Sequence, residues 1–310
     1  MKYVYTDGTQ PISTLKEAMT NSMPSPNGLW LPEKFPKLLL NDSKKSYHDI
    51  IFMVLRALLS DEISDSVLRT IIKESFNFSI PLVHLHDHIH ILELFHGPTM
   101  TFKDVGARFM ARIIRHLIPD KTINVVAATS GDTGGAVADA FSLLPNVNIN
   151  IFYPSGLISS IQEKQITSYG KNVKAYSVDG NFDDCQSIVK QLLRDKIILS
   201  ESFIFPANSI NIIRLIPQVS YYFWAYAQLN INKPVNFCIP SGNLGNITAG
   251  VIAYLMGLPV HKFIVATNIN KTFGTYLTTG IIPEVKAIPS LSCAMDISIP
   301  NNLIRLKYLF

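Results

Sequence analysis

The chain has 310 residues, which is long enough for about two domains and for a core that buries about three quarters of the extended surface. Its 27 basic and 23 acidic residues give a net charge of +4 without any Lys/Arg block, so composition gives no argument for nucleic-acid binding. Hydrophobic residues make up 47% and charged residues 16%, which excludes a disordered chain.

Two sequence features bear on the expected location. No uninterrupted apolar run reaches the roughly 18 residues that a membrane span requires. Residues 1–10 carry Asp7 and Gly8 where a signal peptide would need an apolar core. We therefore expect a cytoplasmic globular protein with no membrane partner.

The first 80 residues are predicted to form a mainly helical unit. They contain few glycines, and residues 47–59 place apolar side chains at the spacing of one helix face. A further helix is predicted over residues 105–117, after a Gly-Pro break.

From residue 122 onward, short strands rich in β-branched residues alternate with helices. This alternation is typical of βαβ units and predicts an α/β fold built on parallel sheets. Strands are predicted over residues 123–128, 147–153, 173–178, 203–206, 235–239 and 262–267. Helices are predicted over an alanine-rich stretch ending at residue 144 and over residues 159–169, 182–194, 210–229 and 247–256.

Ligands of parallel sheets bind at the carboxyl ends of the strands, where this chain has a first glycine-rich loop. Residues 129–135 (TSGDTGG) lie between a predicted strand and a predicted helix. Small residues allow a ligand to approach the backbone, and helix N–H groups and hydroxyls can donate to a carboxylate or phosphate. The alternative is a tight turn with Asp or Thr as the helix N-cap.

A second glycine-rich loop, residues 240–246 (PSGNLGN), has the same placement about 110 residues later. It matches neither the dinucleotide fingerprint nor the P-loop, because a G-K-[ST] ending is absent. A backbone cradle for phosphate is its best physical use. Two such loops suggest one anionic ligand held between two α/β units.

Lys103 is a candidate for covalent chemistry. It follows Phe102 at the start of a predicted helix, and a lysine in apolar surroundings can have the lowered pKa that Schiff-base formation requires. The alternative is a solvated surface lysine.

Histidines occupy alternate positions at His84, His86, His88 and His90. On one strand, this period places all four imidazoles on one face, where an H-x-H pair could bind zinc or another transition metal. The alternative is a polar face turned to solvent. Three cysteines without C-x-x-C spacing predict neither a disulfide framework nor a zinc site.

A polar cluster opens the predicted helix at residues 208–214. Two asparagine amides, a serine hydroxyl and the guanidinium of Arg214 could together clamp a phosphate or oxyanion. The alternative is an Asn/Ser cap beside a structural arginine.

Taken together, these segments resemble the threonine synthase family of pyridoxal-phosphate enzymes of fold type II. The matching segments follow one another along the chain at residues 92–99, 102–104, 129–134, 162–164, 208–214, 241–245, 294–296 and 300–302. The resemblance implies two parallel-sheet α/β domains of the tryptophan-synthase-β-like architecture. The chain would then divide into a helical unit over residues 1–80, a cofactor domain over 81–119 plus 211–310, and a smaller domain over 120–210.

The resemblance also implies roles for single residues. Lys103 would form the Schiff base with pyridoxal phosphate and carry protons. Cofactor contacts would come from Asp132, Gly242, Asn243, Leu244, Gly245 and Asn246, and many family members carry Asp in place of Asn246. Substrate contacts would come from Thr129, Ser130 and Thr133 at the carboxylate and from Asn208, Ser209 and Arg214 at the phosphate.

The implied reaction converts O-phospho-L-homoserine and water into L-threonine and phosphate, as a monomer, with no nucleic-acid partner. One alternative within the fold is a serine/threonine dehydratase-like enzyme. Others are a metal-binding protein organised around the histidines and a non-catalytic remnant. Members of the family normally continue past the segment that ends at Phe310, so we expect either a fragment or a shortened protein.

Overall fold

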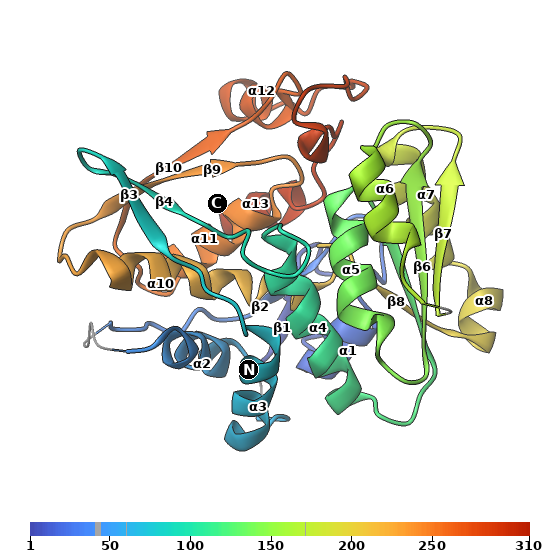
Figure 1. The fold of residues 1–310 in the computed structure, drawn as a ribbon, viewed down its shortest axis with the longest axis horizontal. Helices are drawn as coiled ribbons and strands as arrows, with labels where there is room; N and C mark the ends of the chain where they lie inside the picture. The colour runs from blue at the N-terminus through green and yellow to red at the C-terminus, as the bar shows by residue number, and fades with distance from the viewer. Residues whose placement is uncertain (41–44, 60, 171) are drawn as a thin grey trace.

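The computed structural model describes residues 1–40, 45–59, 61–170 and 172–310. One sheet has four parallel strands in the order β7-β6-β5-β8. Its strands are β5 (Ile123–Ala128), β6 (Val147–Pro154), β7 (Val173–Val178) and β8 (Phe203–Pro206). Its helices are α5 (Asp132–Ser142), α6 (Ser160–Thr167), α7 (Phe182–Leu192) and α8 (Lys196–Glu201), and this unit forms the right half of Figure 1. The predicted parallel α/β architecture is confirmed.

The composition of β5 explains its central place in this sheet. Five of its six residues are buried, whereas the edge strand β7 is half exposed. A strand that is covered on both faces needs a continuous apolar run, and the sequence Ile-Asn-Val-Val-Ala-Ala supplies one with a single polar interruption. The carboxyl end of β5 leads directly into the first glycine-rich loop.

A second parallel pair lies in the other half of the molecule. β9 (Val235–Pro240) pairs with β10 (Val260–Ala266), and α11 (Gly245–Leu255) connects the two strands. α10 (Gln218–Leu229) packs against α11 (Figure 1). The second glycine-rich loop therefore leaves the carboxyl end of a strand, as the first one does.

The N-terminal region is mainly helical, as predicted, but also contains two short strands. β1 (Tyr3–Tyr5) pairs antiparallel with β2 (Trp30–Pro32). The helices are α1 (Leu15–Thr20), α2 (Tyr47–Leu58) and α3 (Asp65–Ser75). Thr14 and Ser46 begin α1 and α2 with capping boxes, in which a hydroxyl and an acidic side chain satisfy the first N–H groups.

Helix α4 (Lys103–Leu117) lies at the centre of the molecule, between the two halves (Figure 1). It packs against α3 and α5, and most of its residues are buried. Its first residue is Lys103, so this side chain lies where the two halves meet. The division of the chain at residues 80, 119 and 210 stays a prediction.

The prediction of one long helix over residues 210–229 is wrong. The structure has a four-residue helix α9 (Ile212–Leu215) and then α10, which begins after Pro217. Proline has no N–H to donate and its ring crowds the preceding turn, so it starts a helix readily but breaks one from within. The apolar periodicity on both sides of Pro217 concealed this break.

The prediction that the four histidines lie on one strand is also wrong. β3 (Leu82–His86) and β4 (Ile89–Leu92) form an antiparallel hairpin, with Asp87 in the left-handed region at φ 48°. His84 lies opposite His90 with ring centroids 5.1 Å apart, while His88 belongs to the turn. The four imidazoles therefore do not line one strand. In the described part of the chain, no three His, Cys, Asp or Glu side chains are grouped closely enough to hold a metal ion.

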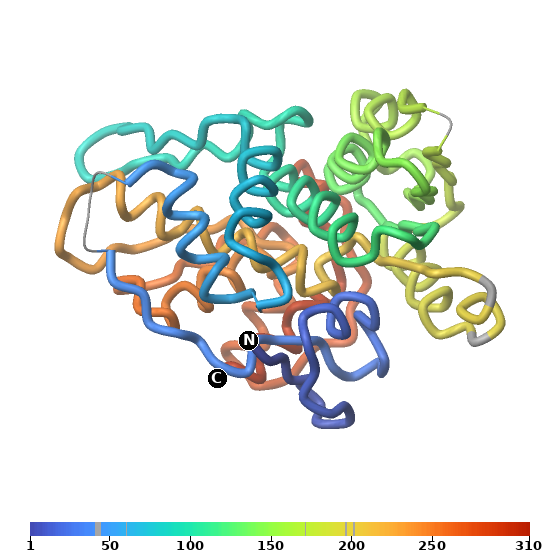
Figure 2. The backbone as a smooth tube through the Cα atoms, turned by 90° about the horizontal axis from the view of Figure 1, so that it is seen from below, coloured from blue at the N-terminus to red at the C-terminus, as the bar shows by residue number. Residues whose placement is uncertain are grey.

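The C-terminal segment returns to the N-terminal region. It contains α12 (Thr272–Thr279), a 3₁₀ turn (Cys293–Met295) and α13 (Leu303–Leu309). Arg305 of α13 donates from Nε to the carbonyl oxygen of Trp30 at 3.0 Å, and Figure 2 shows the red C-terminal segment beside the dark blue N-terminal one. No helix in the described ranges combines the length and apolar character that crossing a membrane requires.

Candidate active site

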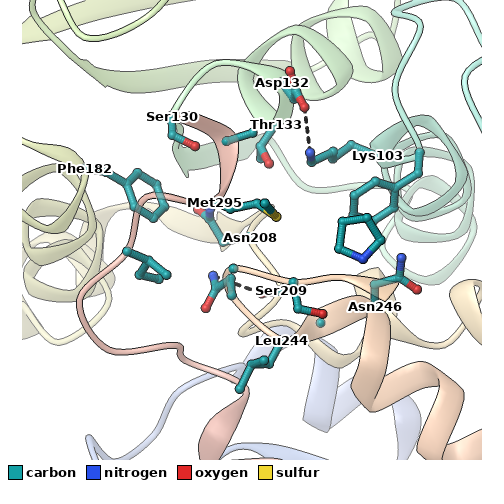
Figure 3. Close-up of a pocket in the computed structure, with 18 of the residues that line it drawn as sticks. Lys103, Ser130, Asp132, Thr133, Phe182, Asn208, Ser209, Leu244, Asn246 and Met295 are labelled. Atoms are coloured by element: carbon teal, nitrogen blue, oxygen red, sulfur yellow. Dashed lines mark hydrogen bonds and ion pairs between the residues drawn. The ribbon is translucent and has the colours of Figure 1, made fainter. Parts of the chain in front are cut away.

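One cavity lies where the ends of β5, β8 and β9 meet the start of α4 (Figure 3). The loops after β5 and β9 line it, together with residues 208–209 and 294–297. The position follows from the topology, because the carboxyl ends of the parallel strands in both halves point to one place.

Lys103 extends into this cavity from the start of α4. Its Nζ lies 2.7 Å from Oδ2 of Asp132, and its ammonium lies over the ring of Phe102, 4.6 Å from the ring centre. The side chain is 17% exposed, so a ligand in the cavity can reach the amine. Asp132 is in turn held by Gln162, whose Nε2 donates to Oδ1 at 2.8 Å.

The environment of Asp132 favours its charged form. Burial by itself raises the pKa of this carboxyl, but the nearby Lys103 ammonium and the hydrogen bonds from Lys103 and Gln162 outweigh that effect. The net result is a pKa below the usual value for aspartate. The cavity therefore contains an ammonium and a carboxylate that hold each other in place.

Asp104 fixes the turn that precedes Lys103. Its carboxylate accepts from the backbone N–H of Thr99 at 2.9 Å and from the Thr99 hydroxyl at 2.7 Å. Gly97 packs directly on this carboxylate, so a Cβ at that position would collide with it. Burial is the main reason that the pKa of Asp104 is raised, and the Thr99 hydrogen bonds oppose it. The Gly-Pro-Thr segment thus places the start of α4.

The loop after β5 is shaped by Thr129. This residue is fully buried, and its Oγ1 accepts from the N–H groups of Gly131 at 2.9 Å and Gly134 at 2.8 Å. Gly131 has φ 129° and packs against the Gln162 side chain, so only glycine fits there. Ser130, Asp132 and Thr133 then face the cavity, whereas Thr129 lies behind it.

The loop after β9 presents backbone N–H groups to the cavity. Among the described residues, no acceptor bonds to the N–H groups of Gly242, Asn243 or Leu244. Leu244 has φ 59° and begins α11 without a side-chain cap. Such a run of unpaired donors at a helix start attracts an anion.

Arg214 and Ser209 add polar groups to the wall of the cavity. Arg214 is 4% exposed and donates from Nη1 to the carbonyl oxygen of Ala207 at 3.1 Å. Burial lowers the pKa of its guanidinium to about 10, and Asp104 partly counters this effect. The Ser209 hydroxyl oxygen accepts from Nδ2 of Asn302 at 2.8 Å. Because a buried cation is costly without an anion, this wall favours an anionic ligand.

Asn208 and Asn246 use their amides mainly inside the protein. Asn208 accepts from the N–H of Ala128 at 2.9 Å and donates to its carbonyl oxygen at 2.7 Å, which continues the pairing of β5 with β8. Oδ1 of Asn246 accepts from the hydroxyls of Tyr221 and Tyr222, both at 2.6 Å. Both residues still line the cavity.

Comparison with known proteins places the chain in a family. The family described as "Threonine synthase N terminus" matches residues 2–76, and that described as "Pyridoxal-phosphate dependent enzyme" matches residues 63–308. The curated threonine synthase of Escherichia coli K12 is 41% identical over 300 residues, which cover 95% of this chain and 70% of that protein. The chain belongs to the threonine synthase family.

Solved structures agree with this assignment. The crystal structure of threonine synthase from Escherichia coli has a TM-score of 0.95 and 40% identity, covering all of this chain and 74% of that one. That of pyridoxal-phosphate-bound threonine synthase from Brucella melitensis has a TM-score of 0.90 and 36% identity, covering 99% and 69%. This threonine synthase family member is thus a pyridoxal-phosphate enzyme of fold type II.

The residues present fit this cofactor. Lys103 supplies a reachable amine, and the loop after β9 supplies unpaired N–H groups for a phosphate. A Cβ on Gly242 would lie 2.7 Å from the Cα of Met295, so the loop has room only for glycine at its closest point. The site of this threonine synthase family member therefore has both elements that a phosphorylated aldehyde needs.

The structure brings together every residue predicted for the site except Thr129, which lies behind its loop. The residues that line the cavity are Lys103, Ser130, Asp132, Thr133, Asn208, Ser209, Arg214, Gly242, Asn243, Leu244, Gly245 and Asn246. Sequence reasoning missed Phe102, Phe182, Gln218 and Met295, which also line it. For Gln218 the sequence held a signal, because this residue lies four positions after Arg214. In the structure, its Nε2 donates to the carbonyl oxygen of Arg214 at 2.8 Å.

Proposed function

We propose that this chain is a threonine synthase that converts O-phospho-L-homoserine and water into L-threonine and phosphate. One observation carries the proposal: a reachable lysine amine and two separate anion-binding elements line the same cavity. A cofactor and a substrate that are both phosphorylated need two such elements. One is the loop at residues 242–245, and the other is the pair Ser209 and Arg214.

In this proposal, the substrate binds by its two charged ends. Ser130 and Thr133 donate to the α-carboxylate from the start of α5, where the helix dipole also favours negative charge. Ser209 and Arg214 hold the phosphate that leaves from Cγ. The bond from Cγ to the phosphate oxygen breaks, water adds at Cβ, and phosphate is released.

Lys103 carries the protons. When bound, pyridoxal phosphate supplies the electron sink that stabilises negative charge on the substrate carbon atoms. Lys103 Nζ takes protons from Cα and Cβ as a general base, and delivers protons to Cγ and Cα as a general acid, so that Cγ becomes the methyl group of threonine. Asp132 accepts a hydrogen bond from Nζ and so keeps the amine pointed into the cavity.

Two measurements test the proposal. Addition of pyridoxal phosphate should give a visible absorbance band, and borohydride should fix the cofactor on Lys103, as shown by peptide mapping. Incubation of the loaded protein with O-phospho-L-homoserine should then yield threonine and phosphate in equal amounts. A label on another lysine, or phosphate release without threonine, contradicts the proposal.

The same experiment separates the alternatives. A serine/threonine dehydratase would turn over L-serine or L-threonine without any phosphate, whereas Ser209 and Arg214 predict that the substrate phosphate is needed. A non-catalytic remnant would take up pyridoxal phosphate only weakly and without saturation.

We further propose that the protein acts in the cytoplasm, as a monomer, and without nucleic acid as a partner. The net charge of +4, spread along the chain, supports the absence of a nucleic-acid partner.

A further inference from the structure

Asn302 contacts both anion-binding elements, and Arg305 contacts Asn302 and the backbone of Ser209. Asn302 is fully buried. Its Nδ2 donates to the Ser209 hydroxyl oxygen at 2.8 Å and to the carbonyl oxygen of Asn243 at 2.9 Å. One amide group thus joins the segment after β8 to the loop after β9.

Arg305 determines which way this amide points. Its Nη1 donates to Oδ1 of Asn302 at 2.6 Å, and a guanidinium can only donate. Asn302 must therefore turn its oxygen toward Arg305 and its NH₂ group toward Ser209 and Asn243. Donation from the guanidinium thus fixes the orientation of the Asn302 amide.

Arg305 is itself held rigidly. It is fully buried and donates to the carbonyl oxygens of Trp30 at 3.0 Å, Ser209 at 2.5 Å and Ile210 at 2.8 Å. In the described part of the chain, no carboxylate lies within ion-pair distance of it. A buried guanidinium held by carbonyl oxygens alone is an expensive arrangement, and it leaves positive charge next to the site.

The hydrogen bond to Ser209 has a consequence for the cavity. A hydroxyl has one proton to donate and two lone pairs to accept with. The Ser209 oxygen accepts from Nδ2 of Asn302 at 2.8 Å and from Nδ2 of Asn243 at 3.5 Å, so its proton is directed elsewhere, and Ser209 lines the cavity. The hydroxyl is thereby prepared as a donor to an anion.

We propose that Asn302 is a positioning residue that fixes the spacing between Ser209 and the loop at residues 242–245, and that Arg305 fixes the direction of its amide. This inference rests on the proposed function, since it assumes that these two elements bind the phosphates of substrate and cofactor. Asn302 touches neither ligand. It acts through the two groups to which it donates.

Asn302→Asp and Asn302→Ala together test the inference. The aspartate keeps the shape and pairs with Arg305, but it cannot donate to Ser209 or Asn243. The alanine removes the donors without adding charge. Each variant should raise the Kd for pyridoxal phosphate, measured by titration of the visible band, at least tenfold. KM for O-phospho-L-homoserine should rise more than kcat falls, and Asn302→Asp should melt no lower than Asn302→Ala.

Asn77→Asp is the matched control. Asn77 also accepts from a buried arginine, with Arg108 Nη2 at 2.9 Å, but it lies away from the cavity. This variant should bind pyridoxal phosphate within twofold of the wild type. An equal loss of affinity in Asn77→Asp would show that any disturbed Asn–Arg pair has this effect, which would overturn the inference.

Other outcomes separate the inference from the proposed function. A wild-type protein with no visible band refutes both. If the wild type binds and both Asn302 variants bind equally well, only the positioning role is wrong. If only Asn302→Asp weakens pyridoxal-phosphate binding, the cause is the added charge, and the positioning role is again wrong. Should both variants unfold, Ser209→Ala decides: unchanged KM and unchanged inhibition by inorganic phosphate would contradict the role.

Discussion

The two glycine-rich loops of this protein look alike in sequence but arrange their polar groups in opposite ways. In the loop after β5, the Thr129 hydroxyl oxygen accepts the N–H groups of Gly131 and Gly134, so two backbone donors are used inside the loop. What this loop offers to the cavity is side chains, above all the Asp132 carboxylate that pairs with Lys103.

The loop after β9 has no residue equivalent to Thr129. Ser241 donates its hydroxyl to the carbonyl oxygen of Ile239 at 3.0 Å, and the N–H groups at residues 242–244 have no acceptor within the described chain. This loop therefore offers backbone donors. One loop acts through side chains and the other through backbone donors, although both follow parallel strands and start helices.

The comparison shows that glycine content alone does not identify a phosphate site. The position of the hydroxyl decides which groups remain available, since a threonine oxygen that points into its own loop uses up the donors. Substitutions in or beside each loop can test this difference separately.

Lys103→Ala should have the largest effect. It removes the group that the first loop holds and that carries protons, so kcat/KM should fall on the order of 10³- to 10⁴-fold and the visible band should disappear. The second loop should keep its donors, and inorganic phosphate should still raise the melting temperature. Lys121→Ala, which alters an exposed lysine, is the control. A visible band that survives Lys103→Ala would contradict the assignment.

Gly242→Ala should have the next largest effect and should destabilise the protein. Gly135→Ala should stabilise it. A Cβ on Gly242 would lie 2.7 Å from the Met295 Cα, which is backbone and cannot rotate away. We expect a loss of about 1–3 kcal/mol in the free energy of unfolding and a weaker hold on pyridoxal phosphate. A Cβ on Gly135 would meet only the Gln165 side chain at 3.4 Å, and helical alanine is favoured over glycine by about 1 kcal/mol.

Thermal melts and cofactor titrations of the two glycine variants check this pair. If Gly135→Ala weakened cofactor binding as much as Gly242→Ala, the loops would not differ in the way described. Equal tolerance of both substitutions would show that Met295 can move.

The sequence was sufficient to locate the cavity and most of the elements between residues 103 and 266. Strands such as β7 and β8 were predicted at their observed bounds, because these runs are too short for helices. Periodicity failed at Pro217 and at Asp87, since a proline break and a hairpin turn both leave the apolar spacing of their neighbours unchanged.

The supporting residues could not be predicted from the sequence. Apart from Asn302, the partners of Arg305 are backbone carbonyl oxygens of Trp30, Ser209 and Ile210, and carbonyl groups leave no mark in a sequence. Gln162 holds Asp132 from 30 positions away, and only the fold brings them together. Chemistry at strand ends can be read from residue types, but the contacts that orient it depend on tertiary structure.

Asp132→Asn should have a moderate effect that depends on pH. The pKa of Asp132 is lowered from its ordinary value of 3.8, so its ion pair with Lys103 stabilises the fold above that value and is lost as pH falls through the lower pKa of the folded state. Wild type should therefore melt roughly 2–4 °C above Asp132→Asn from pH 7 to 5. The gap should close below pH 3.8.

Asp120→Asn, which changes an exposed carboxylate, is the control for the pH series. A gap between wild type and Asp132→Asn that widened toward acid would have the wrong sign for a carboxyl with a lowered pKa. Such a result would show that the Lys103–Asp132 pair does not stabilise the folded state.

Asn246→Asp should have the smallest effect, although it adds a charge beside the second loop. Two effects oppose each other: a carboxylate would accept stronger hydrogen bonds from Tyr221 and Tyr222, but it would repel a bound phosphate. We expect the Kd for pyridoxal phosphate to change by less than about fivefold, or about 1 kcal/mol. The visible-band titration at low and at high salt measures this. A change of a hundredfold would mean that the side chain touches the phosphate, and the loop after β9 would then bind its anion through side chains, as the loop after β5 does.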